Sequence, residues 1–270
     1  MKKSLAEFVD YMKERRLAPN SIKAYVKAVE MFDSNYGDWT AENLEAFKQY
    51  LVCRNKPQTV NQRILALNKY LSFVGETDRK LTPVKIQSKS FSENIISCEE
   101  YLRLKNGLRA DKDKKWYYMV WTMGVTGARV SELMQIRIED VVSGHVDIVS
   151  KGGKSRRIYF PQSLRTEIVE WGMSEGLCSG PLSLNNRGEP ITTRGFAMHL
   201  KNIARKYGVN ESVVYPHSFR HMYAKNFLEK YNDISTLADL LGHESIETTQ
   251  IYLRRSSREQ MRLIDDIVTW

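Results

Sequence analysis

Cysteine is scarce in this sequence, and its copies lie too far apart to build a covalent or metal-bound framework. The 270 residues include three cysteines, Cys53, Cys98 and Cys178, and no two of them form a CxxC pair. An odd number at such spacing argues against a set of disulfides and against a cysteine zinc site. We therefore expect a protein of a reducing cytoplasm, that is, a cytoplasmic protein.

Long apolar runs are also missing. No stretch approaches the roughly 18 apolar residues that a membrane span requires. The opening residues, Met1-Lys2-Lys3-Ser4, lead directly into an amphipathic pattern instead of a signal peptide. Internal repeats and low-complexity tracts are absent as well. The sequence predicts a soluble, unexported protein without a membrane partner.

Acidic residues are fewer than basic residues in this sequence. Lysine and arginine number 41 against 32 aspartates and glutamates, so the formal net charge is +9. A basic excess of this kind is typical of proteins that meet polyanions, although many basic proteins bind none. The charge therefore supports a nucleic-acid partner only if motifs point the same way.

The length and the pattern of apolar residues divide the chain into two domains. A chain of 270 residues is long enough for two cores. Residues 1–77 contain four amphipathic stretches with helical spacing, the first opened by the capping-box pattern Ser4-Leu5-Ala6-Glu7. Residues 78–94 lose the helical period and gain polar and basic residues, which indicates a linker. The second domain is expected at 95–270.

This second domain is expected to be mostly helical with one small sheet. Helical apolar patterns dominate it, and the stretch from Trp116 to Met123 is strongly apolar. Two short alternating segments, at 145–149 and 156–160, flank Lys151-Gly152-Gly153-Lys154. A glycine-containing turn between two such segments is typical of a β-hairpin. The predicted fold class is mainly α with a small antiparallel β-sheet.

Four segments of this domain place polar side chains where the helical pattern does not require them. In the first, Arg129 and Glu132 stand three residues apart on one helix face, which is also the spacing of an ordinary surface ion pair. In the second, Lys151 lies beside two glycines at the hairpin tip, where a plain turn is the common alternative. In the third, a proline-led helix sets His217 and Arg220 side by side near its positive end, which suits an anion or a simple cap and salt bridge.

The fourth segment runs from Leu240 to Tyr252. Gly242 can end one helix and Ser245 can cap the next, which puts His243 in the bend and Tyr252 about two turns further on. A tyrosine on a helix is more often a packing residue than a nucleophile, so only the other three segments nominate Tyr252.

Taken together, two arginines, two histidines, a lysine and a tyrosine suit phosphoryl transfer without a metal ion. Attack on a phosphodiester builds negative charge on the non-bridging oxygens, and the guanidinium fork binds such oxygens bidentately. A phenol has a pKa of about 10, so Tyr252 needs a nearby base or a strongly cationic site to attack as phenolate. A lysine on a mobile hairpin is a reasonable proton donor to the departing 5′ oxygen.

Four strings carry a resemblance to a known family: TGARVSEL, SKGGKSRR, HSFRH and LLGHESIETTQIY, in this order. The chain resembles the tyrosine recombinases, the phage integrase and Xer group, from the N-terminal bundle to the last helix. The resemblance implies a SAM-like helical core-binding domain followed by a DNA breaking-rejoining catalytic domain. It also implies site-specific recombination without a cofactor or a metal ion, because a 3′-phosphotyrosyl link conserves the bond energy.

The resemblance implies roles for the residues that hold the phosphate. Arg129 and Arg220 match the two arginines that clamp the scissile phosphate, and Glu132 matches the acidic residue that supports the first of them. His243 matches the position, histidine or tryptophan in the family, that hydrogen-bonds the phosphate.

The remaining motif residues are implied to move protons or to attack. Tyr252 matches the nucleophile, His217 the histidine that accepts its proton, and Lys151 the lysine that protonates the leaving 5′ hydroxyl. His221 follows the motif without a matching catalytic role, so we expect it to be structural.

Other implied partners lie outside the reaction centre. Double-stranded DNA is the expected substrate, and assembly on it as a tetramer follows from the resemblance. Lys154, Arg156 and Arg157 are interpreted as DNA-backbone contacts, with ordinary strand-edge charges as the alternative. An apolar stripe in the tail fits docking on a partner subunit or packing on its own domain; it consists of Met261, Leu263, Ile264, Ile267 and Val268.

Two other functions remain open at this stage. A type IB topoisomerase shares the catalytic constellation and relaxes DNA without exchanging strands. A non-catalytic DNA-binding regulator built on a recombinase fold is the second alternative, although none of the motif residues is missing here. Because the chain opens with the predicted core-binding bundle, we expect a compact Xer-like or mobile-element enzyme without the arm-binding domain of lambda-type integrases.

Overall fold

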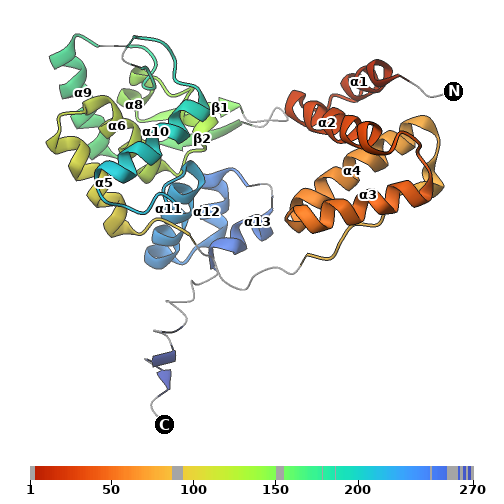
Figure 1. Ribbon diagram of the computed structural model, residues 1–270. Helices are drawn as coiled ribbons and strands as arrows, with labels where there is room; N and C mark the ends of the chain where they lie inside the picture. The colour runs from red at the N-terminus through yellow and green to blue at the C-terminus, as the bar shows by residue number, and fades with distance from the viewer. Residues whose placement is uncertain are drawn as a thin grey trace. The chain divides into compact units, whose positions relative to one another are not determined.

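The computed structural model describes residues 4–86, 94–149, 155–177, 179–185, 187–243 and 245–253, together with 261, 264, 265, 267 and 268 (Figure 1). The chain divides into two compact units, Met1–Ser88 and Lys89–Trp270. None of the helices within the described ranges is both long and apolar enough to cross a lipid bilayer.

Within its described residues, the first unit is a bundle of helices: α1 (Leu5–Glu14), α2 (Pro19–Tyr36), α3 (Ala41–Arg54) and α4 (Pro57–Val74), followed by the short turn η1 (Thr77–Arg79). Each helix start has a local cause. Ser4 and Thr40 cap α1 and α3 with side-chain oxygens that accept backbone N–H groups, and proline opens α2 and α4. The inward faces share one core, in which Phe8, Phe32 and Phe47 are fully buried.

The first residues of the segment predicted as a linker, 78–94, pack on this helical bundle. Leu81 is buried in the bundle core. Asn68 accepts the Leu81 N–H and donates to the Leu81 carbonyl, both at 2.8 Å. Asn61 holds Val84 in the same way, at 2.8 and 2.9 Å. Two asparagines on α4 therefore fix the start of a segment whose composition alone indicated a linker.

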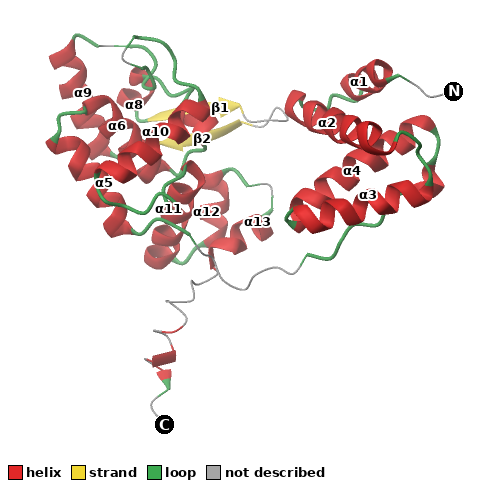
Figure 2. Ribbon diagram, in the orientation of Figure 1, coloured by secondary structure: helices red, strands yellow, loops and turns green. Residues whose placement is uncertain are grey.

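The second unit contains the following elements among its described residues: α5 (Cys98–Ala110), α6 (Lys114–Thr126), α7 (Val130–Leu133), α8 (Ile138–Ser143), β1 (His145–Val149), β2 (Ser155–Tyr159), α9 (Gln162–Glu175), α10 (Thr193–Lys206), α11 (Pro216–Tyr231), α12 (Ile234–Leu241), α13 (Ile246–Gln250) and η2 (Ile251–Leu253). Figure 2 shows that helices dominate and that the strands lie side by side. The predicted fold class, mainly α with a small antiparallel sheet, is confirmed.

Strands β1 and β2 pair antiparallel, with His145 opposite Tyr159 and Val149 opposite Ser155. This is the hairpin that the alternating segments predicted, with the second strand starting one residue earlier. The tip of the hairpin, residues 150–154, lies outside the described residues.

Helix α6 brings the later elements of the unit together. Most of its side chains are buried, among them Tyr118, Trp121 and Met123. Helices α5, α9 and α11 pack on α6, and α12 and η2 pack in turn on α11. Figure 1 shows α11, α12 and α13 grouped together. The end of α6 is therefore close to elements that come more than 90 residues later, as the 2.9 Å hydrogen bond from Arg220 to the Gly127 carbonyl shows.

The two asparagine contacts predict a local effect on hydrogen exchange. In Asn68→Ala, the amide of Leu81 loses its acceptor, so it is expected to exchange roughly fivefold faster, because one such hydrogen bond is worth about 1 kcal/mol. Asn61→Ala should do the same to the amide of Val84. Each variant is the control for the other in a peptide-resolved exchange experiment. Equal protection of both amides in both variants would contradict this account.

Candidate active site

Arg129 is positioned by the turn that ends α6. Gly127 closes that helix in the left-handed conformation, with φ +59°, and α7 starts directly after Arg129. The Arg129 N–H donates to Glu132 Oε2 at 2.7 Å, and Arg129 Nη1 donates to Oε1 at 2.8 Å. Glu132 is buried, whereas the Arg129 side chain is 40% exposed. The carboxylate thus orients a guanidinium that still faces solvent.

Arg220 occupies the interior of the unit at 1% exposure. Its Nη1 donates to the carbonyl of Gly127 at 2.9 Å, and its Nη2 to that of Leu241 at 2.6 Å. Burial, followed by the charges of Arg129 and Arg156, lowers the pKa of Arg220 to about 10, although a hydrogen bond with Tyr252 acts in the opposite direction. Arg220 therefore remains a cation at neutral pH.

His243 follows directly on Gly242, which ends α12 in the left-handed conformation at φ +63°. Its Nε2 lies 2.8 Å from Arg220 Nη2, and its Nδ1 lies 2.8 Å from Thr249 Oγ1. Because a guanidinium only donates, Nε2 must accept, and Nδ1 then carries the proton that goes to Thr249. Burial, then the charges of Arg220 and Arg129, lower the pKa of His243 to about 4, so the ring is neutral at neutral pH.

Tyr252 lies on η2, behind the short helix α13 that Ser245 caps. Its side chain is 3% exposed and belongs to an apolar cluster with Leu228 and Leu237. Its ring centroid is 5.9 Å from that of His243 in a stacked arrangement. Tyr252 was predicted about two helical turns past the bend at His243. The structure has one short helix and a 3-10 turn there, and together they bring the Tyr252 ring back to His243.

His217 and His221 stand one turn apart on α11, and their ring centroids are 4.7 Å apart. His221 also meets the Tyr252 ring edge-on at 4.7 Å. Burial, then the charges of Arg220 and Arg129, lower the pKa of His217. Burial, then His217, lowers the pKa of His221 to about 4. His221 therefore connects the predicted base to the predicted nucleophile.

The structure departs from the prediction for Arg156. This residue was interpreted as a DNA-backbone contact, but its side chain is 5% exposed and pairs with Glu132 at 2.8 Å. The alternation along β2 buries Arg156 and Ile158 together, and the sequence pattern contained that signal. Arg157 points outward and forms a bidentate pair with Asp147, so its contact with DNA stays a prediction.

Lys151 and Lys154 lie outside the described residues, so their predicted roles stay predictions. Thr249 was not singled out from the sequence, and His221 was expected to be structural without a contact to the predicted nucleophile. Both stand inside the quoted motif strings, four residues or fewer from a predicted site residue, which was the signal available.

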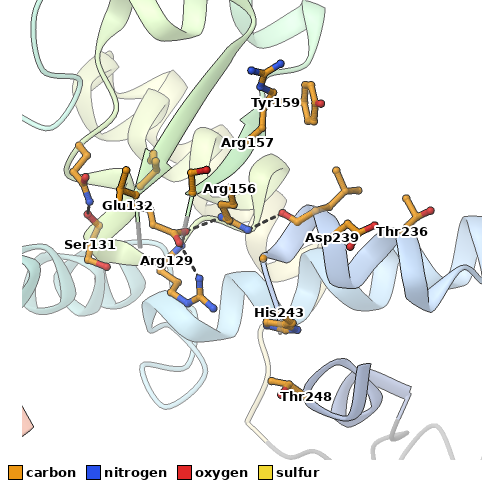
Figure 3. A pocket seen from close by; sticks show the side chains of 16 residues that line it. Arg129, Ser131, Glu132, Arg156, Arg157, Tyr159, Thr236, Asp239, His243 and Thr248 are labelled. Carbon is orange, nitrogen blue, oxygen red and sulfur yellow. Dashed lines mark hydrogen bonds and ion pairs between the residues drawn. The ribbon is translucent and has the colours of Figure 1, made fainter. Parts of the chain in front are cut away.

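Some of these side chains line a pocket of about 1250 Å³ (Figure 3). Arg129 and His243 line it, as do Arg157 and Thr248. Figure 3 shows Glu132 between the guanidinium groups of Arg129 and Arg156. Three arginines and several hydroxyl groups line this cleft beside the carboxylates of Glu132 and Asp239, and the arginines favour the binding of an anion. The arrangement of arginines, histidines and a buried tyrosine on one mainly helical unit is that of a phosphate-handling enzyme.

Comparison with known proteins identifies the class. The model of the phage integrase family matches residues 95–259. Tyrosine recombinase XerA of Pyrococcus furiosus is 30% identical, over 98% of this chain and 96% of that protein. Tyrosine recombinase XerC of Herpetosiphon aurantiacus is 28% identical, over 95% and 92%. The chain belongs to the phage integrase family of tyrosine recombinases, whose activity is site-specific DNA recombination.

Solved structures share the fold. The XerH recombinase in a pre-cleavage complex with its difH substrate has a TM-score of 0.70 at 18% identity, over 99% of this chain and 85% of that one. The Tn1549 transposon integrase in complex with transposon right end DNA has a TM-score of 0.71 at 13% identity, over 99% and 100%.

The lowered pKa values predict how the histidines titrate. An unfolded chain protonates these rings near pH 6.5, and the folded protein protonates His221 and His243 near pH 4. Their contribution to the free energy of unfolding is therefore fully present above pH 6.5 and is lost as the pH falls from 6.5 toward 4. Histidine-ring NMR should give both midpoints near 4 in the folded protein and near 6.5 in urea. Folded-state midpoints near 6.5 would refute the burial argument.

Proposed function

We propose that this recombinase cuts one DNA strand by attack of the Tyr252 oxygen on a phosphate within the Arg129–Arg220 site. The new bond joins that oxygen to phosphorus, and the bond from phosphorus to the 5′ oxygen breaks. The products are a 3′-phosphotyrosyl link and a free 5′ hydroxyl. Attack by another 5′ hydroxyl reverses the step and joins exchanged strands. The observation that carries the proposal is the convergence of Tyr252, Arg220 and His243 in one site.

The two arginines have different surroundings, and both suit a phosphate. Arg129 is oriented by Glu132 and reaches solvent, so it can bind a non-bridging oxygen bidentately. Arg220 is rigidly held by two backbone carbonyls, so its charge is preorganised before DNA arrives. Loss of one preorganised donor in a comparable site slows the chemical step by about 10²–10³. His243, held by Arg220 and Thr249, adds a neutral imidazole next to this charge.

The proton transfers follow from the charge states. His217 has a lowered pKa, so it is available as a neutral acceptor for the phenol proton. The cationic surroundings stabilise the phenolate as it forms. The proton for the 5′ oxygen is assigned to Lys151, at the tip of the hairpin between β1 and β2.

Duplex DNA is the proposed partner, with the first unit as core-binding domain and four protomers on two sites. Solved complexes of XerH and of Tn1549 integrase contain DNA, which supports this partner for a chain of the same fold. In the tail, Met261, Ile264, Ile267 and Val268 are exposed apolar residues, which supports docking on a neighbouring subunit. Leu263, the fifth member of that stripe, lies outside the described residues.

A trapped covalent adduct tests the nucleophile. Genomic DNA fragments with strand nicks are incubated with the protein, denatured, and examined for DNA that stays bound to it. The wild type should form such an adduct, and Tyr252→Phe should form none, because it lacks the attacking oxygen. Tyr231→Phe, which changes an exposed tyrosine on α11, is the matched control and should form it normally. An adduct that persists in Tyr252→Phe would overturn the assignment. Sequencing the trapped DNA would also locate the cleavage site.

The products separate recombination from relaxation. On a plasmid with two copies of the mapped site, recombination yields joined half-sites that amplify as new junctions. A type IB topoisomerase would change only the supercoiling. We expect new junctions that depend on Tyr252. Relaxation without junctions would support the topoisomerase, and tight binding without any adduct would support a DNA-binding regulator.

A further inference from the structure

We propose that Arg156 is a positioning residue of the cleavage reaction, which locks the Arg129 side of the phosphate site to the Arg220–His243 side. The inference rests on the proposed function and goes beyond it, because Arg156 lines the same pocket as Arg129 but directs both of its terminal nitrogens to protein oxygens. It acts through Glu132 and through the last turn of α12.

The contacts of Arg156 span three elements. From β2, its Nη2 donates to Glu132 Oε2 on α7 at 2.8 Å, and its Nη1 donates to the Leu240 carbonyl on α12 at 2.7 Å. The side chain is 5% exposed. Figure 3 shows both hydrogen bonds of this single guanidinium. Arg156 therefore connects the strand to the two helices that carry the site.

At the α7 end, Arg156 completes the surroundings of Glu132. Glu132 Oε1 accepts from Arg129 Nη1, while Oε2 accepts from the Arg129 backbone N–H and from Arg156. The carboxylate is thus fixed from two sides. Its orientation sets that of the Arg129 guanidinium, so a loss of the Arg156 contact leaves Glu132 free to turn and Arg129 with it.

At the α12 end, Arg156 and Arg220 share one helix terminus. The Leu240 carbonyl accepts a hydrogen bond from Arg156, and the carbonyl of the next residue, Leu241, accepts one from Arg220. Consecutive carbonyls in the last helical turn lack intrahelical partners, and cations satisfy them. Because His243 follows two residues later, the position of this turn also fixes the imidazole that Arg220 holds.

Packing reinforces this link. A Cβ atom added at Gly242 would lie 2.6 Å from Arg156 Cδ and 3.2 Å from Arg156 Cβ. The end of α12 is therefore seated directly on the aliphatic stem of Arg156. Glycine at this position serves both the left-handed backbone and the close approach.

Stability alone does not explain a buried arginine here. Burial lowers the pKa of Arg156, and the Glu132 charge opposes that effect. A well-packed apolar pair often replaces a buried ion pair without loss of stability, so the specific gain of an arginine is its directed hydrogen bonds. Those bonds reach two parts of the site at once, which an apolar side chain cannot do.

The test separates binding from cleavage on a nicked duplex that carries the mapped site. Arg156→Met should bind this DNA within about threefold of the wild type, while single-turnover adduct formation at saturating protein falls about 100-fold, in line with a misplaced phosphate donor. Arg156→Lys keeps the charge but not the fork, so it should cleave at least tenfold faster than Arg156→Met. Arg165→Met is the matched control, because Arg165 also donates to a helix-end carbonyl, that of Val142, but lies outside the motif strings and the pocket lining.

Folding is monitored in parallel by circular dichroism and thermal melting. If Arg156→Met unfolds because Glu132 loses its buried partner, the neutral pair Glu132→Gln/Arg156→Met removes both charges and should fold. That variant should still cleave at least 30-fold more slowly than the wild type with near-normal DNA affinity. Wild-type cleavage rates in Arg156→Met or in the neutral pair would overturn the inference. Equal losses of DNA affinity and of cleavage rate in these variants would overturn it as well. If the wild type itself forms no Tyr252-dependent adduct, the proposed function falls, and this inference with it.

Discussion

The guanidinium of Arg220 donates to two carbonyl oxygens, those of Gly127 and Leu241, at the ends of helices α6 and α12. Helix C-termini carry partial negative charge, so two of them facing one cation offset much of the cost of burying it. The same guanidinium also fixes the ring of His243. The rest of the site depends on this arrangement, because α7 follows the turn at Gly127, and α13 and η2 follow the bend at His243. A shift of α12 against α6 would therefore move the nucleophile relative to both arginines.

Positive charge is concentrated around this group. Arg129, Arg156 and Arg220 influence one another and the nearby histidines, and Glu132 balances only part of their charge. Together with burial, this crowding keeps His217, His221 and His243 neutral at neutral pH. Repulsion among the cations costs folding stability, and a bound phosphate relieves it. The arrangement that opposes folding therefore also favours the binding of a DNA phosphate.

Much of the architecture could be predicted from the sequence. The helical spacing, the capping box at Ser4 and the hairpin were visible in the order of residue types, because each depends on local chemistry. The surroundings of Arg156 were harder to predict. Its partner Glu132 is 24 residues away and the Leu240 carbonyl is 84 residues away. A sequence does not show which backbone carbonyl a side chain will contact. The anchoring of Leu81 by Asn68 could not be predicted for the same reason, because it involves backbone groups of Leu81. The roles of the motif residues come from resemblance, and they stay predictions until the variants are measured.

The burial of Tyr252 restricts how the reaction can proceed. A phosphate of a duplex cannot enter the apolar cluster of Leu228 and Leu237, so the proposed attack requires the Tyr252 hydroxyl to leave this cluster. The elements that hold Tyr252 are short, since α13 spans five residues and η2 three. Segments of this length have few backbone hydrogen bonds of their own and move at small cost. The arginines, in contrast, are fixed by α6, α7, α11 and α12. A phosphate clamp beside a tyrosine on a short segment allows DNA binding to organise the attack without rebuilding the clamp.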